Sequence, residues 1–154
     1  MNLQATAVSL LRDATKMLVM DLEALPEEAS IQRFSPATRT VADIIYEVKL
    51  VNDHIGMVIR GEEPFTWPEG DWIKAPADFQ TKQAVIEGFK QSADTIVATA
   101  QALSAEDLET TVKTEHGDTS RFERCQFMAL HMWYHSGQLN FIQTLRGDDK
   151  WHWN

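Results

Sequence analysis

The sequence predicts an all-α protein, a four-helix bundle folded as a single domain over residues 1–154. Four long segments repeat apolar residues at the three-and-four spacing of a helix, and no comparable set of strands appears between them. A chain of 154 residues is long enough for one proper core, because a domain of this size buries roughly 70% of the surface that it exposes when unfolded.

The first two helices have recognisable ends. The first runs from about Leu3 to Leu25 and stops at Pro26, since proline cannot continue a helix. The second begins after Thr40, which resembles a capping-box residue with Asp43 in place of the usual Glu, and we expect it to stop at Gly61.

The third helix is predicted from about Thr81 to Leu103, with its apolar residues on one inward face. The fourth opens with Ser120 and Glu123 at capping-box spacing, continues to about Arg146, and ends at Gly147.

Two linkers stand out. Residues 61–79 hold three prolines and the aromatic residues Phe65, Trp67 and Trp72, which suggests a long connection that folds over something. Residues 104–119 predict a short turn at 104–108 and then a small hairpin, with residues 110–115 leading to a turn at His116, Gly117 and Asp118.

Charge and composition exclude several functional classes. The 14 basic and 23 acidic residues give a net charge of −9, which argues against binding nucleic acid or an anionic membrane surface. No apolar run approaches a membrane span, no secretory signal is visible, and the only cysteine is Cys125. We therefore expect a cytoplasmic protein in which Cys125 is a buried structural thiol.

The fourth helix carries two histidines one turn apart, His131 and His135. They share a face with apolar neighbours, so the imidazoles point toward the core, where two rings at this spacing can chelate one transition metal. The alternative is a pair of core histidines, each hydrogen-bonded to a neighbour. A third ligand decides between the two interpretations.

The second helix offers two candidates for that ligand, Glu47 and His54. Seven residues separate them, about 10 Å at 1.5 Å per residue, so they are not expected to bind the same ion. Either one with the histidine pair makes a three-ligand site with open positions, as in catalytic metal centres. The zincin motif is absent because Met132 stands where a zincin has Glu, and no histidine has Glu three residues before it, as a di-iron bundle requires.

Two motifs resemble the DinB superfamily, also described as DinB/YfiT-like. The stretch from His131 through His135 to Gln138 resembles the family pattern H-x3-H-R-G-Q, and the segment from Thr40 to Glu47 resembles T-x6-H. Two positions depart from the family: Glu47 stands where most members have His, and Ser136 stands where they have Arg.

The resemblance implies a DinB/YfiT-like four-helix bundle with a divalent metal at one end, nickel or zinc, with iron or manganese as alternatives. By this alignment the ligands are Glu47, His131 and His135, and His54 is a competing ligand or a polar group of the cavity. Family members that transfer or use small thiols suggest a thiol S-transferase of the bacillithiol or mycothiol type, or an isomerase, acting on a small-molecule substrate. Gln138, Tyr134, Trp67 and Trp72 are then expected around the pocket for substrate or cofactor.

A non-catalytic bundle is the competing hypothesis. In it the metal is structural or adventitious, and the protein acts through a dimer or partner surface. Trp151 and Trp153 near the end of the chain favour this slightly, since they are expected to pack back on the body or against a second subunit of a homodimer.

Overall fold

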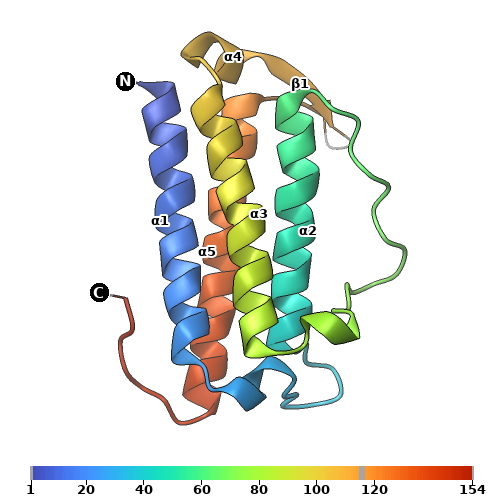
Figure 1. Cartoon of the computed structure of the whole chain (residues 1–154), viewed down its shortest axis with the longest axis vertical. Coiled ribbons are helices and arrows are strands. Elements are labelled where there is room, and N and C mark those ends of the chain that lie inside the picture. The colour runs from blue at the N-terminus through green and yellow to red at the C-terminus, as the bar shows by residue number, and fades with distance from the viewer. Residues whose placement is uncertain (1, 115–116, 154) are drawn as a thin grey trace.

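The computed structural model describes residues 2–114 and 117–153, and four long helices make up most of it (Figure 1). They are α1 (Leu3–Ala24), α2 (Val41–Arg60), α3 (Lys82–Ala102) and α5 (Arg121–Leu145). Helices α1 and α2 each pack against both α3 and α5, so the four helices form a closed ring around the core. The predicted all-α class is confirmed, and the long helices are arranged as a bundle.

Neighbouring helices in the ring differ in direction. α1 runs parallel to α5 and α2 runs parallel to α3, while the other neighbours are antiparallel (Figure 1). Because α2 and α3 are consecutive and parallel, the chain must travel back along the full length of α2 between them. Residues 61–76 make this return along the outer side of α2 and lead into the short helix η2 (Ala77–Phe79). The aromatic linker is therefore a crossover lying on α2.

Side-chain caps fix where the helices begin. Ser120 and Glu123 form the predicted capping box at the start of α5. Thr40 caps α2, but Asp43 does not complete a capping box: its carboxylate instead accepts hydrogen bonds from the backbone N–H of Ala75, at 2.9 Å, and from Arg33, at 3.1 Å. Asp43, predicted from the sequence as part of a capping box, thus binds the crossover to the start of α2.

Two positions require glycine, one for its backbone conformation and one for close packing. Gly61 ends α2 as predicted, with a φ of 77° in the left-handed region that favours glycine. Gly88 lies on α3 where the ring of Phe79 packs, and a side chain at this position would overlap that ring. The close approach holds the end of the crossover against the bundle.

Short elements lie in the two remaining connections between the long helices. η1 (Glu27–Ser30) follows α1, and α4 (Ala105–Glu109) occupies the region predicted as a turn. β1 (Thr111–Thr114) pairs antiparallel with β2 (Gly117–Ser120), which confirms the small hairpin. Gly117 and Asp118 belong to β2 and not to the turn as predicted, while Glu115 and His116 lie outside the described residues. None of the described helices has the length and apolar character needed to cross a lipid bilayer.

Candidate metal centre

Three side chains from two helices converge at one point between α2 and α5. Glu47 lies two turns inside α2, and His131 and His135 come from consecutive turns of α5. The two Nε2 atoms lie 3.1 Å apart, and Oε1 of Glu47 lies 3.8 Å from Nε2 of His131 and 3.6 Å from Nε2 of His135. Among the described residues, these three form the group of potential ligands whose donor atoms all lie within 4.8 Å of one another.

The size of this triangle suits a single ion. Two donors bound at about 2.1 Å lie about 3.0–3.4 Å apart when the angle at the metal is between about 90° and the tetrahedral value. The three separations, 3.1, 3.6 and 3.8 Å, fall at or slightly above that range. A small contraction would bring all three donors onto one face of a coordination shell.

The hydrogen bonds indicate which nitrogens are available. Nδ1 of His135 lies 2.9 Å from Oε1 of Gln138, so Nδ1 donates its proton to the amide and Nε2 presents a lone pair to the site. Two facing lone pairs would repel, and Nε2 of His131 therefore carries the proton of the 3.1 Å contact. Its Nδ1 is buried without a hydrogen-bond partner.

The protonation states favour metal binding. The rings of His131 and His135, followed by the nearby Arg39, hold the pKa of the Glu47 carboxyl well below its usual range, against the opposing effect of burial. Burial lowers the pKa of His131, and Glu47 opposes this. At neutral pH the carboxylate is therefore ionised and His131 is neutral, which are the forms that bind a metal.

Arg39 is a member of the site that sequence reasoning missed. Its Nη2 atom lies 2.6 Å from Oε2 of Glu47 and also donates to the backbone oxygen of Asp43 at 3.0 Å. The ring of Trp72 covers its guanidinium, with 5.0 Å between Cζ and the ring centroid. Arg39 precedes α2 and belongs to no periodic pattern, so no signal in the sequence marked it.

His54 lies elsewhere on α2. Its ring packs edge-on against Phe65, at 5.2 Å between centroids, and against Trp67, at 5.8 Å. Its buried Nδ1 has no hydrogen-bond partner. Of the two candidates for third ligand, the structure brings Glu47 to the histidine pair and places His54 under the crossover.

The other residues expected around the pocket take different places. Gln138 contacts His135 directly, and the ring of Tyr134 lies 4.9 Å from that of His135 while remaining exposed. Trp72 packs against Arg39, which in turn pairs with Glu47, and Trp67 packs against His54. A pocket of about 830 Å³ lies beneath the crossover, lined in part by Tyr46, Leu50, Phe65 and Trp72.

The site is open on one side. The side chain of His135 is 1% exposed, whereas those of His131 and Glu47 are 15% and 19% exposed. Phe127 stacks on His131 with 5.9 Å between the ring centroids and is itself exposed. The triangle is therefore partly exposed at Glu47 and His131 and closed at His135.

Ser136 points away from the triangle, toward α1. Its hydroxyl donates to the carboxylate of the buried Asp21, to which Nε1 of Trp153 also donates at 2.8 Å. Burial raises the pKa of Asp21, and these hydrogen bonds oppose the shift. Trp153 thus packs back on the body, while Trp151 is 71% exposed.

Cys125 is fully buried on α5. Burial raises the pKa of its thiol to about 11, so it is un-ionised near neutral pH, as the structural interpretation requires.

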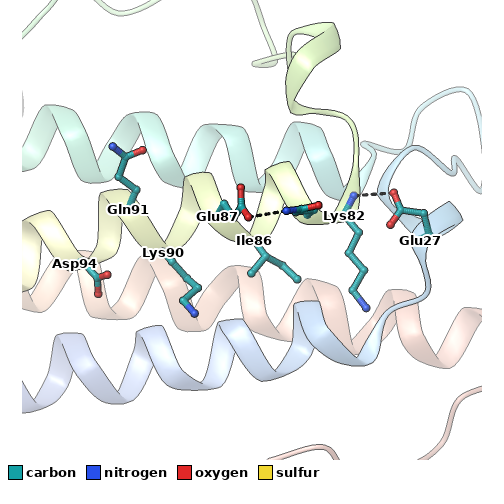
Figure 2. Close-up of a pocket in the computed structure, with 8 residues that line it drawn as sticks. Glu27, Lys82, Ile86, Glu87, Lys90, Gln91 and Asp94 are labelled. Atoms are coloured by element: carbon teal, nitrogen blue, oxygen red, sulfur yellow. Dashed lines mark hydrogen bonds between the residues drawn. The ribbon is translucent and has the colours of Figure 1, made fainter.

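A second groove lies far from this chemistry, along the outer surface of α3 beside α1 (Figure 2). Figure 2 shows the side chains of Lys82, Lys90, Glu87 and Asp94 along it, with the backbone of Lys82 bonded to Glu27. Its lining mixes both charge signs and includes no histidine or cysteine. This is an ordinary solvated helix face.

Comparison with known proteins identifies the family. The model of the DinB superfamily matches residues 10–139. No curated protein matches.

Solved structures share the fold. A DinB-like protein from Bacillus cereus is 16% identical, with a TM-score of 0.69 and coverage of 87% of this chain and 86% of that one. A conserved protein from Enterococcus faecalis is 14% identical, with a TM-score of 0.72 and coverage of 94% and 97%. A mutant of the mycothiol-dependent maleylpyruvate isomerase is 12% identical, with a TM-score of 0.68; the match covers 88% of this chain but only 60% of the isomerase.

Proposed function

The chain belongs to the DinB superfamily, and on this basis we propose that it is a metal-dependent enzyme whose divalent ion is held by Glu47, His131 and His135. The observation that carries the proposal is the donor triangle, with separations of 3.1, 3.6 and 3.8 Å and with Glu47 and His131 partly exposed. Two histidines and one carboxylate suit nickel or zinc, and also iron or manganese. Three protein ligands leave positions open, as catalytic centres require.

We further propose that the reaction transfers a small-molecule thiol, of the bacillithiol or mycothiol type, onto an electrophile, with isomerisation of a small molecule as the related alternative. A bound divalent ion supplies one thing to this chemistry, a lower pKa for a coordinated thiol, so that the sulfur is present as a thiolate near neutral pH. The shared fold of a mycothiol-dependent isomerase supports the choice of thiol chemistry. The buried, un-ionised Cys125 leaves the reactive sulfur to the cofactor.

The protein's own residues then position the reactants. Arg39 holds Oε2 of Glu47 and leaves Oε1 facing the histidines, while Gln138 fixes the ring of His135. Trp72 lines the pocket under the crossover and also covers Arg39, so Trp72 and Arg39 link this pocket to Glu47. We assign the small-molecule substrate to this pocket and expect the activity in the cytoplasm.

The first experiment measures metal content by elemental mass spectrometry on tag-free protein. Wild type is expected to hold about one equivalent, and Glu47→Ala and His131→Ala are expected to lose it while keeping their helical content. His54→Ala is the matched control and is expected to retain the metal, because His54 packs against Phe65 and Trp67. If His54→Ala loses metal and Glu47→Ala keeps it, the ligand set is wrong. If no protein holds metal after loading with zinc, nickel or manganese, the proposal fails.

An activity assay then distinguishes the enzyme hypothesis from the second candidate function. In that second candidate the protein is a non-catalytic bundle with a structural or adventitious ion, and it acts through a dimer or partner surface. The exposed apolar residues on α5 are the observation that favours this second candidate. A screen of small thiols against electrophiles, run with wild type and His131→Ala, distinguishes the two. Metal-dependent consumption of thiol by wild type alone supports the enzyme, and a metal-loaded protein without turnover supports the second candidate.

A further inference from the structure

The outer face of α5 is unusually apolar. Nine large apolar side chains are exposed in the described part of the chain, and five of them lie on this one helix. Their exposed fractions range from 41% to 64%. They are Phe127, Leu130, Tyr134, Phe141 and Leu145.

These five residues form one continuous stripe. Their spacings of three, four, seven and four residues place them within about 60° of arc at 100° per residue. Gly137 occupies the remaining place in the row, and space is open around it where a side chain would project. We call this row, from Phe127 to Leu145 with Gly137, the α5 stripe; at 1.5 Å per residue it is about 27 Å long.

The helix around the stripe lacks formal charge. None of the 21 residues from 125 to 145 is Asp, Glu, Lys or Arg, although such residues make up 24% of the whole chain. A helix that faces water normally carries charged residues on its outer side. Arg124, just before this run, places its guanidinium 5.2 Å from the centroid of the Phe127 ring. The residues after Arg124 have the aromatic, uncharged composition found at the core of protein interfaces.

We propose that the α5 stripe binds the α5 stripe of a second copy of this chain, with the two helices antiparallel. The row is self-complementary in this arrangement, because pairs at equal distances from its centre meet across a two-fold axis. Phe127 meets Leu145 of the second copy, Leu130 meets Phe141, and Tyr134 meets Gly137. Each pair sets a larger side chain against a smaller one, and the open space at Gly137 receives Tyr134.

Area supports a second copy as the occupant. Each copy carries a net charge of −9, which opposes association, and the absence of acidic residues from 125 to 145 keeps like charges of α5 out of the contact. The five side chains of the α5 stripe, about half exposed, supply on the order of 400 Å² of apolar surface per copy. The stripe thus supplies about half of the roughly 800 Å² per partner of a standard interface. The uncharged side chains of Gln126, Gln138 and Thr144 border the stripe.

The proposed interface adjoins the metal centre. Phe127 stacks on His131 at 5.9 Å, and Tyr134 packs against His135 at 4.9 Å. The helix of the second copy therefore lies beside His131 and His135. Dimerisation would cover both aromatic rings and narrow the approach to the donor triangle.

Sedimentation equilibrium with matched variants tests the surface. Wild type is expected to be a dimer, and Leu130→Glu is expected to raise the dissociation constant about 100-fold or more, because both copies would bury an unpaired carboxylate. Ile31→Glu is the control, since Ile31 is 57% exposed, Leu130 is 59% exposed, and Ile31 lies outside the stripe. A wild-type monomer at every concentration overturns the proposal, as does a dimer that Leu130→Glu leaves intact.

Disulfide trapping tests the antiparallel register. The double variant Leu130→Cys, Phe141→Cys is expected to form a covalent dimer on mild oxidation, whereas neither single variant does. Residues 130 and 141 of one helix lie about 16 Å apart, too far for a disulfide within a chain, and Cys125 is fully buried. Cross-linking of Leu130→Cys alone would indicate parallel helices. Absence of cross-linking in the double variant would exclude the pairing of residue 130 with residue 141 of the second copy. Either result overturns the proposed arrangement.

Discussion

Nη2 of Arg39 lies 2.6 Å from Oε2 of Glu47, and this ion pair turns the other carboxylate oxygen toward the two histidines. Arg39 precedes α2 while Glu47 lies two turns inside it, so the pair spans the start of the helix. Both side chains are largely buried, at 13% and 19% exposure, and Trp72 covers the guanidinium. The orientation of the proposed carboxylate ligand therefore depends on a residue that is not itself a proposed ligand.

Replacing Arg39 tests this dependence. Arg39→Met keeps an apolar stem beneath Trp72 and removes the hydrogen bond to Glu47. We expect metal affinity to fall about 10- to 100-fold, because Glu47 loses the partner that orients it. Isothermal titration with zinc or nickel measures the change, with Arg33→Met as the control on a neighbouring arginine that pairs with Asp43. Tighter binding by Arg39→Met would show that removing a positive charge matters more than orientation.

Two replacements of Gln138 are expected to have different effects on metal affinity. Its Oε1 accepts the Nδ1 proton of His135, so Gln138→Leu removes the acceptor and is expected to weaken metal binding about 10- to 100-fold. Gln138→Glu keeps an acceptor at the same place and makes His135 more basic, so affinity is expected to equal or exceed that of wild type. The two variants differ little in size, and parallel titrations compare them. Equal loss in both would show that the contact does not orient His135.

Asp43 is expected to hold the crossover on α2. Its buried carboxylate accepts the backbone N–H of Ala75 at 2.9 Å, and Asp43→Ala leaves that group without a partner. We expect the free energy of unfolding to fall by about 1–3 kcal/mol and proteolysis within residues 61–76 to become faster. Urea unfolding and limited proteolysis measure these effects. Glu62→Ala, an exposed change at the start of the same linker, is expected to alter neither by a comparable amount.

The buried Asp21 is expected to make the free energy of unfolding depend on pH. Burial raises its pKa above the ordinary value of 3.8, so the folded state binds the proton more tightly than the unfolded state does. The stability of wild type relative to Asp21→Asn is therefore expected to rise as the pH falls from above the raised pKa to about 3.8, and then to level off.

Urea unfolding at a series of pH values gives this difference directly. Trp153→Phe removes a hydrogen bond that lowers the pKa of Asp21, so the rise is expected to begin at a higher pH in that variant. A difference between wild type and Asp21→Asn that is independent of pH would contradict the assignment.

The sequence by itself determined the four long helices and the pair of histidines. Apolar spacing and caps such as Ser120 act within a few residues, so they can be recognised without knowing what packs nearby. The same is true of His131 and His135, because residues four apart on a helix share a face.

Only the tertiary structure decided what completes the site. Glu47 and His54 lie on similar faces of α2 two turns apart, and the longitudinal register between α2 and α5 brings Glu47 level with the histidines. Arg39 enters from outside any periodic segment, and the irregular crossover sends Trp67 to His54 and Trp72 to Arg39. These contacts join residues far apart in the chain, and local periodicity holds no information about the packing that brings them together.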